Sequence, residues 1–228
     1  MSTVNIFEFE SNLIEFSDVS FGNKGQKMVD LSLDKTSNSW SKKIIFQTCK
    51  NEKDPLTSIY GLSKVREGDM DGTKRNIELV VTDEEIIQSL KKIDEKIMKH
   101  GFENSQTFFR KALTEVEIEA KYKPILKWKE PKDVNGKGHY YIVVKVKCPG
   151  DNKPTPIKKF NENKLVGGSI DDLNHGCKVV PVVRLLFMWF MTDSFGVTPQ
   201  ADKFLVFPGV EKSFLDGFVL DSVFEICD

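Results

Sequence analysis

The chain has 228 residues, of which 39% are hydrophobic and 29% are charged, a balance typical of a folded domain and not of a disordered chain. No apolar run approaches the roughly 20 residues that a membrane-spanning helix needs. Residues 1–9 lack the basic region that precedes the apolar part of a signal peptide. We therefore expect a protein that is neither membrane-embedded nor secreted.

The cysteines and histidines are few and scattered. Neither a CxxC pair nor an HxxxH pair occurs, so the sequence predicts no zinc site, no other metal and no cofactor. We expect free thiols in a reducing compartment for Cys49, Cys148, Cys177 and Cys227.

The net charge of −1 hides an uneven distribution. Residues 121–164 contain twelve lysines and four acids, whereas residues 165–228 contain four basic and nine acidic residues. A basic segment within a nearly neutral chain indicates a localised anionic partner. The alternative is a lysine-rich face that serves only solubility.

The first eighty residues predict β structure, because apolar and polar residues alternate in short runs between turn signals. The sequence DMDG at 69–72 is a turn signal. Strands are expected at residues 4–10, 13–16, 28–33, 43–47 and 76–81.

The clearest helix begins at Thr82. Thr82 and Glu85 have the spacing of a capping box, and Gly101 is expected to cap the other end. One apolar face is predicted from the spacing of Ile86, Leu90, Ile93 and Ile97. Residues 107–120 are a candidate for a second, shorter helix.

The second half returns to β structure, since Pro124 excludes a helix interior around it. In the strand expected at 139–148, Ile142, Val144 and Val146 share one face. Residues 176–207 read as two long strands joined by a polar break and an FGVT corner. Pro199 cannot donate a ladder hydrogen bond, so the sequence does not fix the register of the second strand around it.

Many short strands, frequent turns and one strong helix predict a mostly β or α+β fold, described best by a Greek-key barrel that carries one long capped helix. No shift in composition is sharp enough to mark a domain boundary. We expect a single domain over residues 1–228, with its core at about 1–210.

Sequence motifs of nucleotide and hydrolase chemistry are absent. The chain has no GxxxxGK[ST], GxGxxG or GxSxG. Two carboxylate pairs, at residues 69/71 and 171/172, have no histidine or third acid at a useful spacing, and turn or capping roles are favoured for them. We expect no enzyme and no catalytic residue.

Lysines and aromatic residues interleave at residues 121–129 and 139–147, and aromatic residues lie near Arg184 in the two long strands expected within residues 176–207. Lysines neutralise phosphates, and ring faces accept any base without reading sequence. The alternative is that the rings are buried and the lysine stems cover them. The candidate nucleic-acid-binding residues are Lys121, Tyr122, Lys123, Lys127, Trp128, Lys129, Tyr140, Lys145, Lys147, Arg184, Trp189 and Phe195.

The end of the chain, residues 211–228, mixes acids with phenylalanines. Such a segment can compete for a basic groove, dock on partner proteins, or form a final amphipathic strand or helix. The sequence leaves these three roles open.

Several segments together resemble a known family. In chain order they are FQT (46–48), YGL (60–62), the capped helix, KYKPILK (121–127), the lysine-rich strand, KVVPVVRLLFMWF (178–190) and FGVT (195–198). They resemble the single-stranded-DNA-binding proteins of nucleo-cytoplasmic large DNA viruses, which are similar to OB-fold helix-destabilising proteins of some bacteriophages. The resemblance implies an OB-like barrel in the host cytoplasm or nucleus. It places Tyr122, Lys123, Lys127, Trp189 and Phe195 in matching motifs.

The sequence therefore favours sequence-tolerant binding of single-stranded DNA in viral DNA replication, recombination or repair, with RNA as an open second ligand. Segment 211–228 would then contact replication proteins, and the chain would act as a monomer or a homodimer. The alternative is a structural or scaffolding protein of a virion or replication site that binds other proteins. Basic residues that converge on one groove would favour the first hypothesis, and scattered ones the second.

Overall fold

Five strands close into a barrel. The computed structural model describes residues 4–6, 10–22, 25–33, 44–48, 55–65, 72–131, 136–161 and 164–207. The barrel strands are β6 (Leu56–Thr57), β7 (Lys74–Val81), β10 (His139–Lys147), β13 (Lys178–Phe190) and β14 (Phe195–Phe207).

The order of these strands is that of an OB fold. Strand β7 pairs antiparallel with both β6 and β10, and β13 pairs antiparallel with both β6 and β14. The ring closes where β10 runs parallel to β14, so that the third strand in chain order lies beside the fifth. The predicted OB-like Greek-key barrel with a long helix is confirmed.

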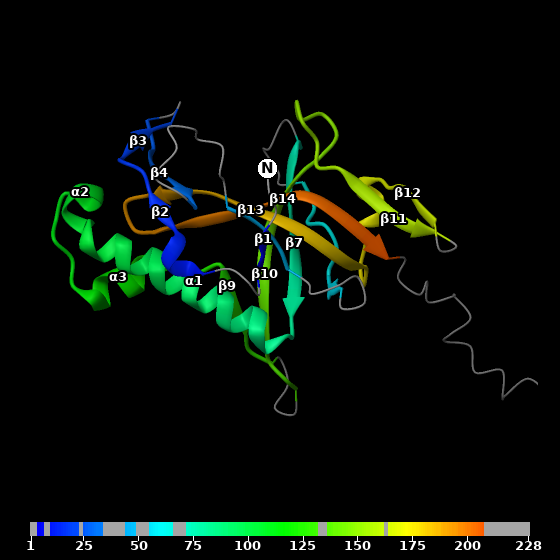
Figure 1. Cartoon of the computed structure of the whole chain (residues 1–228), viewed down its shortest axis with the longest axis horizontal. Coiled ribbons are helices and arrows are strands. Elements are labelled where there is room, and N and C mark those ends of the chain that lie inside the picture. Colours follow the sequence, from blue (N-terminus) through cyan, green and yellow to red (C-terminus); the bar gives the residue numbers. More distant parts are fainter. Residues whose placement is uncertain are drawn as a thin grey trace, which may run out of the picture.

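Further strands extend the barrel sheet on both sides (Figure 1). Strand β4 (Lys27–Ser32) and strand β5 (Ile45–Gln47) pair with β13. Strand β11 (Ile157–Asn161) pairs with β14. The short strands are β1 (Val4–Asn5), β2 (Glu15–Phe16), β3 (Ser20–Phe21), β8 (Tyr122–Lys123), β9 (Leu126–Lys129) and β12 (Lys164–Gly167). Single 3₁₀ turns lie at Ser11–Leu13 and Ile170–Asp172.

Several strand predictions need correction in their bounds. The strand expected at 13–16 is a 3₁₀ turn followed by the two residues of β2. No strand was predicted at Lys164–Gly167, which forms β12. Of the strand expected at 4–10, the structure describes the two residues of β1 as strand, and residues 7–9 lie outside the described part. Residues 69–71 of the turn predicted at 69–72 also lie outside it, as does the segment 208–228.

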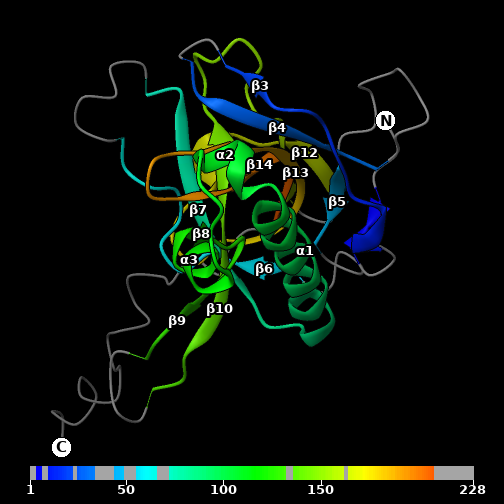
Figure 2. The ribbon, with the colours of Figure 1, turned by 90° about the vertical axis from the view of Figure 1, so that its left-hand side faces the viewer.

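Three helices cluster at one end of the barrel (Figure 2). They are α1 (Glu84–Glu103), α2 (Ser105–Phe109) and α3 (Glu115–Lys121). The cap of α1 is Asp83 and not Thr82, because the Asp83 carboxylate accepts hydrogen bonds from the backbone N–H groups of Glu85 and Ile86. A capping box does occur, between Thr114 and Glu117 at the start of α3.

Gly101 is not the end of α1. The helix continues to Glu103, and Gly101 is buried against Phe195, where an added Cβ would lie 2.6 Å from the ring. The glycine therefore allows helix and hairpin to approach each other. The predicted apolar face of α1 is confirmed, since Ile86, Leu90, Ile93 and Ile97 are all buried.

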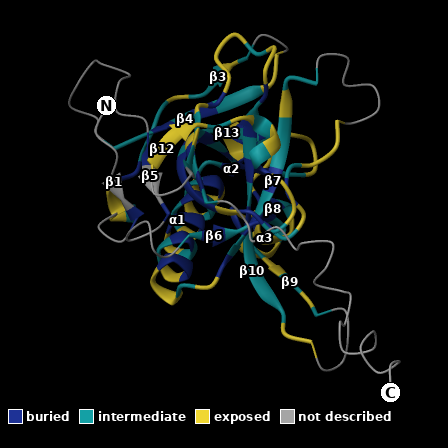
Figure 3. Ribbon diagram, turned by 90° about the vertical axis from the view of Figure 1, so that its right-hand side faces the viewer, coloured by how far each residue is buried: buried dark blue, intermediate teal, exposed yellow. Residues whose placement is uncertain are grey.

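The core fills the barrel and the space under α1 (Figure 3). Alternate residues of β10 point inward, and the predicted set Ile142, Val144 and Val146 is buried. The long hairpin β13–β14 is also confirmed. Its register shifts between Leu185 and Met188, beside Pro199, which pairs with Leu185. This irregularity accommodates a proline that has no N–H to donate. Among the described residues, no helix is long and apolar enough to cross a membrane.

Candidate functional site

A groove lined by cations crosses the outer surface of the barrel. Its volume is about 660 Å³. It lies over β7, β8–β9, β10 and the turn end of the β13–β14 hairpin. The cationic side chains that line it are Lys64, Lys74, Arg75, Lys123, Lys127 and Lys145. We call this hollow the cation groove.

Strand pairing explains why Lys74, Lys127 and Lys145 share one face. Residues directly opposite each other in antiparallel strands project to the same side. Lys145 lies opposite Asn76, and Lys127 lies opposite Tyr141. Because Ile142, Val144 and Val146 fill the barrel, the odd-numbered residues of β10 must face outward.

The described residues that line the cation groove carry a net positive charge. None of the described residues that line it is an acid. Lys64, Lys74, Lys123 and Lys127 make no ion pair with any residue in the described part of the chain. Arg75 has a structural task, because its guanidinium donates hydrogen bonds to the backbone carbonyls of Leu62 and Ser63. A surface with several unneutralised lysines attracts polyanions.

One aromatic side chain lies in the cation groove. Trp189 is half-buried and sits opposite Gly196 in the hairpin. A Cβ on Gly196 would meet the Trp189 ring at 3.2 Å and the carbonyl oxygen of Lys123 at 2.7 Å. The glycine thus brings the ring and β8 together, so that Trp189 lies beside Lys123.

A buried carboxylate fixes the segment that carries Lys123 and Lys127. Asp94, on α1, accepts hydrogen bonds from the Tyr122 hydroxyl and from the backbone N–H groups of Ile125 and Leu126, at 2.8 and 3.0 Å for the two amides. Burial raises the pKa of Asp94 to about 6, although these three hydrogen bonds lower it. Helix α1 therefore sets the position of one wall of the cation groove.

Two predicted stacking rings are in the core, which corrects the expectation for them. The exposed fraction is 8% for Tyr122 and 0% for Phe195. Their ring centroids lie 5.2 Å apart, and Phe195 also contacts Phe109 and Phe190. Neither ring presents a face to a base. Burial and the bond to Asp94 hold the pKa of Tyr122 well above its ordinary value.

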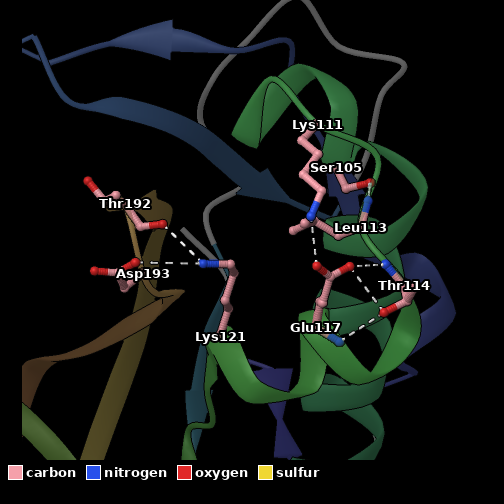
Figure 4. A network of polar contacts seen from close by, with 8 residues as sticks. All are labelled: Ser105, Lys111, Leu113, Thr114, Glu117, Lys121, Thr192 and Asp193. Atoms are coloured by element: carbon pink, nitrogen blue, oxygen red, sulfur yellow. Dashed lines mark hydrogen bonds and ion pairs between the residues drawn. The ribbon is translucent and has the colours of Figure 1, made fainter.

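Four predicted cations are engaged with other groups. Lys121 donates to the backbone carbonyl of Thr192 at 3.1 Å and lies 3.9 Å from the Asp193 carboxylate, so it holds the hairpin turn (Figure 4). Lys129 pairs with Glu78 at 2.9 Å. The other two pairs are Lys147 with Asp151 and Arg184 with Asp202.

Trp128 and Tyr140 lie on the opposite face of the β9–β10 hairpin from Lys127. The two residues are paired across the strands, and their ring centroids are 4.8 Å apart in an edge-to-face arrangement. Trp128 is 48% exposed. Neither ring lines the cation groove, although the sequence analysis grouped Trp128 and Tyr140 with Lys127 as candidate binding residues.

The structure therefore brings together four of the predicted residues, namely Lys123, Lys127, Lys145 and Trp189. Sequence reasoning missed Lys64, Lys74 and Arg75, which lie outside the basic segment 121–164. The adjacent cations at 74 and 75, next to a predicted strand, were the available signal. Among the described residues, no group of three His, Cys, Asp or Glu side chains could hold a metal ion.

No family model and no curated protein matches the chain. Solved structures with a similar arrangement include the single-stranded DNA-binding protein from bacteriophage Enc34, at 14% identity and a TM-score of 0.39, covering 84% of this chain and 88% of that one. Its C-terminal truncation has 12% identity and a TM-score of 0.40, with coverages of 86% and 95%. The single-stranded DNA-binding protein gp2.5 encoded by bacteriophage T7 has 11% identity and a TM-score of 0.45, with coverages of 77% and 95%.

The OB-like fold of this chain follows from its own strand pairings and not from these distant likenesses. The resemblance to a family of large DNA viruses stays a prediction from the sequence.

Proposed function

We propose that this protein binds single-stranded DNA without regard to sequence, and that the cation groove holds the phosphate backbone. The observation that carries the proposal is the convergence of six cations, with no described acid among them, on one face of the barrel. Each lysine that replaces a condensed counterion releases it, and this release drives binding. The same convergence favours nucleic acid over the alternative of a scaffold that binds other proteins.

The position of the cation groove supports this proposal. OB folds bind oligonucleotides on the face of their second and third strands and with the loop that joins the first two. Here those strands are β7 and β10, and Ser63 and Lys64 belong to that loop. The position of the cation groove supports the proposal by analogy with other OB folds, whereas its charge is a property of this chain.

The kind of cation supports sequence tolerance. Five of the six are lysines, which contact phosphate as point charges, and the arginine fork that can read guanine is engaged with backbone carbonyls. Trp189 offers a ring, and any base has a face that can stack on it. Unpaired strands expose those faces, whereas duplexes do not.

The biological role that we propose is the coating of unpaired strands during viral DNA replication, recombination or repair. Segment 211–228, with its acids and phenylalanines, is the proposed contact for replication proteins. We propose that the chain does no chemistry on the strand it holds.

A binding titration tests the proposal. Fluorescence anisotropy of labelled oligo(dT), the duplex of the same length and oligo(U) would be measured at low and at high salt. We expect tight binding to oligo(dT) that weakens steeply with salt, with a slope of about −0.7 per phosphate contacted, and weaker binding to duplex. Affinity for oligo(dT) that does not change with salt would contradict the proposal. The oligo(U) titration decides whether RNA is also a ligand.

A further inference from the structure

A second hollow adjoins the cation groove on the other side of β8–β9. It has a volume of about 620 Å³ and lies between α1 and the β9–β10 hairpin. Its apolar lining includes Met98, Leu126, Trp128 and Tyr140. We call it the aromatic hollow.

The two hollows share part of their lining. Lys123, Pro124 and Lys127 line both of them, so this short segment forms a ridge with cations on one side and rings on the other. A third lysine, Lys91 of α1, stands at the aromatic hollow with its ammonium group 5.1 Å from the centre of the Tyr140 ring. A polyanion that lies in the cation groove therefore finds further positive charge where it crosses the ridge.

The Trp128 ring is held in place before any ligand arrives. Its Nε1–H donates a hydrogen bond to Glu130 at 3.0 Å. The backbone at Gly138 packs against it so closely that an added Cβ would lie 2.2 Å from the ring. An aromatic side chain that is both exposed and fixed loses little conformational entropy when it stacks on a base.

The acids of the aromatic hollow indicate which part of a strand fits there. Asp94 and Glu95 both belong to the lining. The Asp94 carboxylate is occupied by its hydrogen bonds to Tyr122, Ile125 and Leu126, and Glu95 is exposed. The charge of the Glu95 carboxylate repels phosphates but does not repel an uncharged base.

We propose that a single strand crosses the ridge at Lys123–Lys127, with its phosphates on the cation groove and its unpaired bases turned into the aromatic hollow, where Trp128 stacks on them. This inference rests on the proposed function and deepens it. Helix α1 becomes part of the binding surface, and the backbone and the bases of the ligand are held on opposite sides of β8–β9.

Abasic oligonucleotides distinguish binding of the bases in the aromatic hollow from binding of the phosphates in the cation groove. The wild-type chain would be titrated with oligo(dT) and with an abasic strand of the same length and charge. We expect the abasic strand to bind at least about 5-fold more weakly, because each stacked base contributes about 1–3 kcal/mol. In Trp128→Leu the affinity for oligo(dT) should fall by about the same factor, the difference between the two strands should shrink, and the salt slope should stay that of the wild type.

Phe21→Leu is the matched control, because Phe21 is 68% exposed on β3 and does not line the aromatic hollow. Circular dichroism would verify that both variants fold. A second readout uses Trp40→Phe/Trp189→Phe, in which Trp128 is the remaining tryptophan and its fluorescence should be quenched by oligo(dT) but not by the abasic strand. If Trp128→Leu keeps both the wild-type affinity and the full difference between the strands, the inference is wrong while the proposed function stands. If the wild type does not bind oligo(dT), the proposed function itself fails.

Discussion

The hydroxyl group of Tyr122 donates a hydrogen bond to the carboxylate of Asp94, which lies 28 residues earlier in the chain. The ring is buried, and the same carboxylate holds the backbone of Ile125 and Leu126. Tyr122 thus ties helix α1 to the wall of the cation groove. Its ring belongs to the lining of the aromatic hollow, but its hydroxyl group is engaged with Asp94.

Tyr122→Phe separates this structural role from a role in binding. The variant keeps the ring but removes a buried hydrogen bond to a charged acceptor. Its free energy of unfolding should therefore be about 1.5–3 kcal/mol lower than that of the wild type. Urea denaturation measures that loss. The affinity of the folded variant for oligo(dT) should stay within about 2-fold of the wild-type value. Weakened binding with unchanged stability would place the tyrosine in the binding surface after all.

The buried Asp94 and the half-buried His100 have opposite pKa shifts, which give the free energy of unfolding a specific pH dependence. The pKa of Asp94 is raised by burial to about 6, and burial lowers the pKa of His100, which stacks on Phe16, to about 4. Between pH 4 and 6 the folded Asp94 binds more protons than the unfolded one, so its contribution to stability falls as pH rises. Between pH 4 and 6.5 the folded His100 binds fewer protons than the unfolded one, so its contribution to stability rises with pH.

The two contributions oppose each other in the wild type, and single variants should reveal each one. In Asp94→Asn, acidification from pH 6.5 to 4 should destabilise the chain more than it does the wild type, by about 1–3 kcal/mol. In His100→Gln it should destabilise the chain less than it does the wild type. Chemical denaturation across this range measures both differences, and the remaining titrating groups cancel in the comparison with wild type. Parallel pH profiles for all three proteins would contradict the assigned shifts.

The Glu78–Lys129 pair borders the cation groove and offers a variant that should gain affinity. The carboxylate lies 2.9 Å from the Lys129 ammonium group, which also stands over the ring of Tyr60 at 4.4 Å. Glu78→Gln removes an acid from the outer face of β7 and releases a lysine. We expect affinity for oligo(dT) to rise about 2- to 5-fold and stability to fall by about 1 kcal/mol or less.

Glu103→Gln is the control for this prediction, because it frees Lys99 in the same way at the far end of α1. It should leave the affinity for oligo(dT) unchanged in the same anisotropy assay. Equal gains from both variants would mean that net charge, and not the place of the charge, determines binding.

The elements with the strongest periodicity were predictable from the sequence. The alternation in residues 139–148 and the apolar spacing of Ile86, Leu90, Ile93 and Ile97 gave β10 and the inner face of α1. Helix ends were less certain, because Thr82 and Asp83 are adjacent cap formers and tertiary packing against Phe195 lets the helix continue past Gly101.

The candidate site was predictable only in part, for two physical reasons. A tyrosine or phenylalanine between lysines has the same pattern whether the ring is buried or exposed, and only the contact between Tyr122 and Asp94, distant in sequence, decides between them. The cation groove also needs Lys64 and Lys74, which the closure of the barrel brings to Lys123 and Lys145. No local pattern in the chain predicts that meeting.

The salt dependence of binding in two lysine variants tests the central claim most directly. Lys74→Ala/Lys123→Ala/Lys127→Ala removes three charges from the cation groove. Lys92→Ala/Lys158→Ala/Lys178→Ala removes three exposed charges from outside it. In plots of log Kobs against log salt for oligo(dT), we predict that the groove variant binds more weakly with a slope shallower by about 2, and that the control keeps the wild-type slope. Identical slopes for the two variants would contradict the assignment of the cation groove as the site that holds the strand.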